Sequence, residues 1–100
     1  MKNVQTSLRS LSPKLYEYMI EKFDEKFHIQ PYDLQITAVK QENGFHIIVK
    51  YGERFDHQSE QFFSLESIEK RDESVMQFIQ EAGEACKKVL IDDYFRMMTP

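Results

Sequence analysis

Residues 34–51 read LQITAVKQENGFHIIVKY, in which two runs of alternating apolar and polar residues flank Asn43 and Gly44. A period of two is typical of strands with one buried face. Asn-Gly between two such runs favours a two-residue hairpin, because a type I′ turn needs positive φ at both central residues. We therefore predict a β-hairpin whose turn is centred on Asn43 and Gly44.

The register of this hairpin follows from its turn. A two-residue turn there places Lys40 opposite Ile47 and Ala38 opposite Val49, and facing residues share one side of the sheet. The apolar side then consists of Leu34, Ile36, Ala38, Ile47, Val49 and Tyr51. The other side carries a Val39–Ile48 pair among polar residues. If helices cover only one side, this pair is a candidate partner-binding surface.

A first helix is predicted from Pro13 to Phe27. Ser12 can cap its free N–H groups, and Pro13 suits the first helical position because its missing N–H costs nothing there. Pro31 prevents the helix from continuing far beyond Phe27. Apolar residues recur at steps of four, which indicates one buried stripe. They are Leu15, Met19, Phe23 and Phe27.

Residues 1–11 give a weaker pattern. Leu8 and Leu11 have helical spacing, but many of their neighbours are poor helix formers. We expect a frayed lead-in that docks on the domain through these two leucines.

The returning strand is predicted over residues 60–65, after a bulge or a bend at Gly52 and a turn at residues 56–59. A short turn is expected around Ser67 and Ile68.

The last helix is predicted to begin near Asp72 or Ser74, either of which can cap it, and to run through Met98. About 25 residues at 1.5 Å each make a rod of roughly 37 Å. The strands span only about 20–30 Å. We therefore expect the aromatic and methionine-rich end of this helix to project beyond the sheet.

The predicted fold is α+β in the order α-β-β-β-α, with a three-stranded antiparallel sheet and two helices packed on one face. The 100 residues fit a single domain, residues 1–100, whose core needs no disulfide or metal. The expected core residues are Leu15, Met19, Phe23, Leu34, Ile36, Ile47, Val49, Phe63, Val75, Ile79, Ala82, Cys86 and Leu90.

The charge and the apolar content of the chain make some classes of binding partner less favourable than others. The net charge is −4, and no Lys/Arg run is longer than two residues. Nucleic acids and anionic membranes both attract positive charge, so both are disfavoured. No apolar stretch approaches the length of a membrane span or a signal peptide, and the single cysteine forms no internal disulfide. These features indicate the cytoplasm.

No motif for catalysis, cofactor binding or metal binding stands out. His28, His46 and His57 lack metal-ligand spacing. Cys86 lies within an apolar helical stripe, which indicates a buried small side chain rather than a nucleophile. Adjacent acidic residues diverge on a helix and cannot converge on one substrate atom. The sequence therefore predicts a protein that is not an enzyme and carries no cofactor.

The element order is similar to that of the double-stranded-RNA-binding domain, and Pro31, Tyr32, Gly44 and His46 resemble part of its pattern. That resemblance implies duplex-RNA binding through a basic cluster at the start of the last helix. The corresponding residues are acidic here, beginning with Asp72. Because phosphate binding needs positive charge, nucleic acid stays a disfavoured partner.

Two functional hypotheses remain. The first is a non-enzymatic protein-interaction module: an adaptor, an inhibitor or a homodimer. Aromatic residues, Met and Arg are enriched at interfaces. Its candidate partner-binding residues are Tyr94, Phe95, Met97, Met98, Val39 and Ile48. The alternative is a small-ligand binder or enzyme with a cleft between the sheet and the helices, lined by Phe45, Tyr51 and His57.

Overall fold

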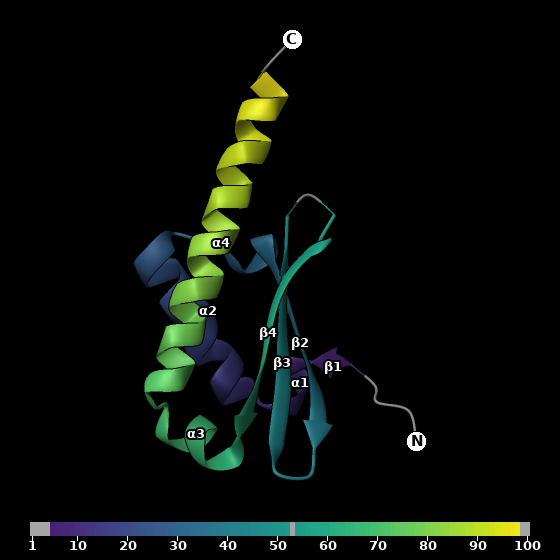
Figure 1. The fold of residues 1–100 in the computed structure, drawn as a ribbon, viewed down its shortest axis with the longest axis vertical. Helices are drawn as coiled ribbons and strands as arrows, with labels where there is room; N and C mark the ends of the chain where they lie inside the picture. The colour runs from purple at the N-terminus through teal and green to yellow at the C-terminus, as the bar shows by residue number, and fades with distance from the viewer. Residues whose placement is uncertain (1–4, 53, 99–100) are drawn as a thin grey trace.

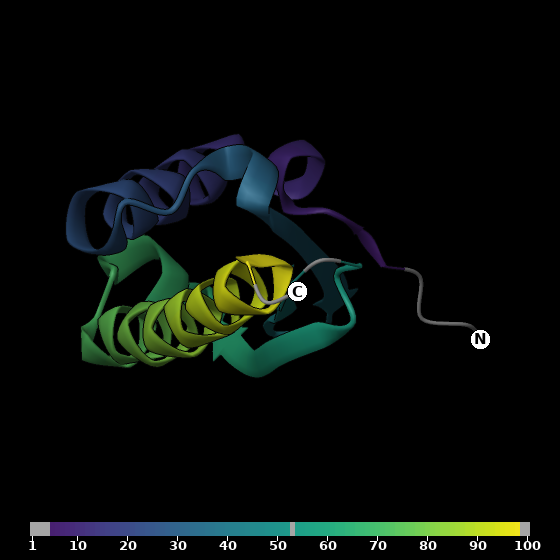
Figure 2. The same cartoon turned by 90° about the horizontal axis from the view of Figure 1, so that it is seen from above.

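A computed structural model describes residues 5–52 and 54–98, and the side chains of residues 5–52 and 54–92. The fold is α+β, and four antiparallel strands form one sheet in the order β1-β2-β3-β4. The helices lie on one side of this sheet (Figures 1 and 2). In chain order the elements are β1 (Thr6–Ser7), α1 (Leu8–Leu11), α2 (Pro13–Phe27), the 3₁₀ turn η1 (Pro31–Asp33), β2 (Leu34–Gln41), β3 (Gly44–Tyr51), β4 (His57–Ser64), α3 (Leu65–Lys70) and α4 (Glu73–Met98).

The predicted three strands are therefore one too few. Part of the lead-in forms β1, in which Thr6 pairs with Ala38 and Ser7 with Thr37. Two residues are too few to show a period of two, so no sequence pattern could reveal this strand. The free edge of β2 supplies the partner. Leu8 of α1 is fully buried, as the docking prediction required.

The hairpin forms with a register that differs from the predicted one. Ala38 lies opposite Ile47 instead of Val49, and the two turn residues are Glu42 and Asn43. Neither of them has positive φ, so the predicted type I′ turn is wrong. Each residue faces a partner two positions earlier than predicted. Because side chains alternate with a period of two, the apolar side keeps its predicted members.

Close packing of β4 explains the shift. Gly44 lies in β3, directly opposite Ser64. A Cβ placed on Gly44 would lie 2.0 Å from the carbonyl oxygen of Phe63 and 2.8 Å from Cα of Ser64. Gly44 is thus needed for the approach of a neighbouring backbone, not for a turn conformation. A sequence pattern does not distinguish these two uses of glycine.

β4 begins earlier than predicted. His57, Gln58 and Ser59 belong to this strand, so the turn predicted at residues 56–59 is wrong. The chain reverses instead after Gly52, whose φ is 97°, and the backbone N–H of Phe55 donates to the Gly52 carbonyl at 3.2 Å. The bend predicted at Gly52 is therefore confirmed.

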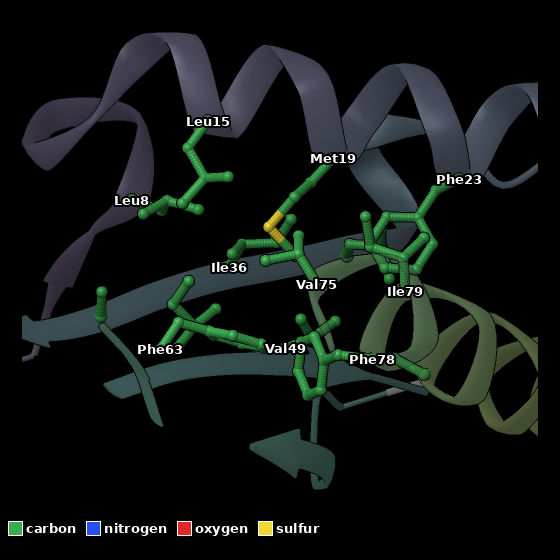
Figure 3. Close-up of a cluster of buried hydrophobic side chains, with 14 of the residues drawn as sticks. Leu8, Leu15, Met19, Phe23, Ile36, Val49, Phe63, Val75, Phe78 and Ile79 are labelled. Atoms are coloured by element: carbon green, nitrogen blue, oxygen red, sulfur yellow. The ribbon is translucent and has the colours of Figure 1, made fainter. Parts of the chain in front are cut away.

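The core lies between α2, α4 and the inner face of the sheet (Figure 3). Met19 of α2 points towards Ile36 of the sheet and Val75 of α4. Leu15 lies beside Leu8 of α1. Phe23 lies beside Ile79 of α4. Every predicted core residue is buried except Leu90, which is partly buried against the cluster. Within the described side chains, no polar or charged residue is buried.

Candidate interaction surfaces

Helix α4 begins at a side-chain cap. Asp72 Oδ1 accepts hydrogen bonds from the backbone N–H of Ser74 at 3.1 Å and from its hydroxyl at 2.6 Å. A weaker bond at 3.4 Å comes from the N–H of Val75. The hydrogen bond from the Ser74 hydroxyl stabilises the ionised carboxylate most, and it is the main cause that lowers the pKa of Asp72. Asp72, one of the two residues predicted to cap this helix, is therefore the residue whose side chain caps it.

Among the described side chains of α4, which end at Asp92, the last fully buried one is Cys86. Val75, Ile79, Ala82 and Cys86 are buried, whereas Val89 and Leu90 are only partly buried. The helical backbone continues to Met98, about 18 Å beyond Cys86 at 1.5 Å per residue. The end of α4 extends past the other elements (Figure 1), which confirms the predicted overshoot.

A shallow hollow lies on the protein surface where α4 passes the end of α2. Gly83 allows close contact there, since a Cβ at this position would lie 2.2 Å from the ring of Phe27. The hollow has a volume of about 350 Å³. Its apolar lining comes from Phe27 and from Ile91, which is 45% exposed. The charged residues around it are Glu84, Lys87, Lys88 and Asp92.

Sequence patterns did not identify this hollow. Phe27 was predicted as one member of the α2 stripe, and Ile91 carried no prediction. A glycine within an apolar helical stripe is the available signal, because it indicates close approach of another element. The predicted partner-binding residues Tyr94, Phe95, Met97 and Met98 follow directly along α4, but their side chains lie outside the described part of the structure.

The outer face of the sheet differs from the prediction. Val39 lies opposite His46, and Ile48 lies opposite Thr37, so the two residues are not a cross-strand pair. They are only 9% and 5% exposed. Thr37, the cross-strand partner of Ile48, lies on this face, and its hydroxyl donates to Gln5 Oε1 at 3.0 Å. The prediction that Val39 and Ile48 form an exposed cross-strand pair is therefore wrong.

Phe62 is the exposed apolar residue of this face, at 42%. It lies on β4 opposite His46, whose Nε2 is 3.4 Å from Glu60 Oε1. The sequence places Phe62 in the third predicted strand but does not show which face it occupies, because the adjacent Phe63 is equally apolar. In the structure Phe63 takes the inner face and packs edge-on against Phe78.

The residues of the alternative cleft lie in two separate places. Tyr51 and His57 stack with ring centroids 5.8 Å apart, and the Tyr51 hydroxyl is 3.4 Å from Ser59 Oγ. Phe45 lies opposite Phe63 at the other end of β3. The three residues therefore do not line one cleft.

The remaining candidates for chemistry have structural positions. His28 follows α2 in the left-handed conformation at φ 57°, where it ends the helix. Cys86 is fully buried, and burial raises the pKa of its thiol to about 11, with a smaller contribution from the charge of Asp33. A buried neutral thiol is a poor nucleophile. Within the described residues, no three His, Cys, Asp or Glu side chains are grouped so that they could hold a metal ion.

Comparisons with protein-family models, curated proteins and solved structures give no match to this chain. Among residues 5–52 and 54–98, no helix combines the length and the apolar character needed to cross a bilayer.

Proposed function

We propose that this protein is a non-enzymatic interaction module that binds another protein chain through the C-terminal part of α4 and the adjacent hollow. One observation carries the proposal: α4 continues for twelve residues after Cys86, which is the last fully buried side chain among those described up to Asp92. A helix of this length is marginal in water unless one of its faces is packed. The sequence of that end adds Tyr94, Phe95, Met97 and Met98, which are residue types enriched at interfaces.

The hollow supports the same interpretation. Its apolar lining from Phe27 and Ile91 would receive an apolar side chain of the partner. Lys87 and Lys88 favour acidic groups beside that side chain, while Glu84 and Asp92 favour basic ones. The expected partner surface is therefore one apolar anchor flanked by charges of both signs, as on one face of an amphipathic helix.

Two matched substitutions test this surface. Ile91→Glu places a charge in the hollow, whereas Gln77→Glu places the same charge on an exposed position near the start of α4. A version of the chain ending at Asp93 removes the aromatic and methionine residues. Chromatography with light scattering measures self-association, and affinity capture with mass spectrometry measures unlike partners. An unlike partner that is captured equally by the full chain, by Ile91→Glu and by the chain ending at Asp93 would contradict the proposal.

A second candidate function uses the same hollow. Its volume of about 350 Å³ falls within the range of small-molecule sites, about 300–1,000 Å³. Lys87 and Lys88 favour an anionic group on a small aromatic or aliphatic molecule, and Glu84 and Asp92 favour a positive group on the same molecule. Thermal-shift screening with such zwitterionic carboxylates and phosphates tests this candidate. A stabilising compound should lose its effect in Ile91→Glu and keep it in Gln77→Glu.

A further inference from the structure

Strand β4 forms one edge of the sheet (Figure 1). On the side away from β3, its backbone pairs with no other strand in the described part of the chain. The free N–H and C=O groups of an edge strand are a template for another strand. This edge is eight residues long, His57–Ser64, whereas β1 at the opposite edge has only two residues.

The features that normally protect such an edge are missing from β4. The strand contains no Pro, Gly, Lys or Arg. Its register with β3 runs without interruption from Gly44–Ser64 to Tyr51–His57, so no bulge twists the edge away. Glu60 is its only acidic residue. A long, regular and weakly charged edge favours pairing with a further strand.

The middle of β4 is exposed on both faces of the sheet. Gln61 lies on the helix-covered side, opposite Ile47, and is nevertheless exposed. Phe62 is exposed on the outer side. The helical layer therefore stops short of this edge, and added apolar contact is available at Phe62.

We propose that a second copy of this chain adds to β4, strand against strand, and joins two four-stranded sheets into one of eight strands. The edges pair antiparallel about a two-fold axis perpendicular to the sheet, so each β4 meets the same strand of the other copy. Residues that face each other across the two strands must lie on the same face of the sheet. The axis must therefore lie at a residue that faces its own copy, and not between two consecutive residues of the strand. The central positions of β4 are Glu60 and Gln61.

The charge of Glu60 decides between an axis at Glu60 and an axis at Gln61. An axis at Glu60 would place two carboxylates directly opposite each other, which is destabilising. An axis at Gln61 places two neutral amides there and sets Glu60 against Phe62 of the second copy. In this register residues 58–64 of both copies are paired. A second copy is the occupant that suits this edge, because β4 then pairs with itself over seven residues and its only acidic side chain has no carboxylate directly opposite.

The register makes Gln61 the position at which to test the dimer. Gln61→Lys and Gln61→Glu each set two like charges face to face, and each should raise the dissociation constant about tenfold or more. An equimolar mixture of the two variants sets Lys against Glu and should restore association. Gln61 is exposed, so both variants should fold, and circular dichroism verifies this. Gln77→Lys, on an exposed position of α4, is the matched control.

The measurement is size-exclusion chromatography with light scattering over a concentration series. The expected result is a full chain with twice its 12.0 kDa mass, single Gln61 variants that dissociate, and a mixture that re-forms the dimer. The chain ending at Asp93 should remain dimeric, because β4 is intact; its behaviour separates this dimer from the surface on α4. A full chain that stays monomeric throughout, or a dimer unaffected by Gln61→Lys, would overturn the proposal.

Discussion

Replacing Gly44 by alanine tests the observed register of the hairpin. In the structure the added Cβ would lie 2.0 Å from the Phe63 carbonyl oxygen and 2.8 Å from Cα of Ser64. Both atoms belong to the backbone, so relief requires β4 to move away from β3. Overpacking costs typically about 1–3 kcal/mol, and we expect a loss near the upper limit, about 3 kcal/mol, because no side chain can rotate away. That is a large fraction of the stability of a small domain, about 5–15 kcal/mol.

Urea unfolding followed by circular dichroism measures this loss, and two further variants make the test specific. A type I′ turn centred on Asn43 and Gly44 would accept asparagine at the second position. In the observed register Gly44→Asn should be at least as destabilising as Gly44→Ala. Asn43→Ala should cost no more than about 0.5 kcal/mol, since Asn43 is exposed and has no positive φ. A cost below about 1 kcal/mol for Gly44→Asn would refute the observed register.

Three further predictions concern α4. Gly83→Ala should destabilise the protein, because the ring of Phe27 lies 2.2 Å from the added Cβ. In a Phe27→Ala background the same change should instead stabilise the protein by up to about 1 kcal/mol, because alanine has a higher helix propensity than glycine. A double-mutant cycle from urea unfolding measures this reversal. Cys86, with its pKa raised to about 11, should react with a thiol reagent about a hundredfold or more slowly in the folded protein than in urea. Because the pKa of Asp72 is lowered in the folded state, its carboxylate stabilises α4 above the unfolded value of 3.8 and loses that effect as the pH falls through the folded value. The Tm difference between the wild type and Asp72→Ala should therefore be present at pH 7 and shrink below pH 3.8.

The elements that could be predicted are those decided by local chemistry. Helix α2 has the predicted bounds, because Pro13 marks its start and its apolar stripe ends at Phe27. The predicted cap from the Ser12 side chain is wrong, since that side chain makes no capping hydrogen bond. The inner face of the hairpin was also predicted, since a shift of two residues leaves the faces unchanged. Both depend on periodicity, which each segment carries by itself.

The elements that could not be predicted depend on contacts between distant segments. β1 exists only because the edge of β2 is free, and the turn at Glu42 and Asn43 depends on how closely β4 approaches Gly44. The same holds for the candidate sites. The tail of α4 was predicted from composition and helix length. The hollow needs Phe27 and Gly83 to meet across two helices, and the free edge of β4 needs the strand order.

The two proposed surfaces, if both are present, determine how the assembly binds its partners. A two-fold axis perpendicular to the sheet reverses the strand direction, and α4 runs roughly along the strands (Figure 1). The free ends of α4 in the two copies would therefore point away from each other, each with its own hollow. The dimer should then bind two partner molecules, and a partner with two binding segments should bind it more tightly than either segment alone.

Light scattering of the complex measures this stoichiometry. Gln61→Lys should change the complex from two chains with two partners to one chain with one partner, without abolishing binding, whereas Ile91→Glu should leave a dimer that binds none. Loss of binding in Gln61→Lys would show instead that the partner site lies on β4.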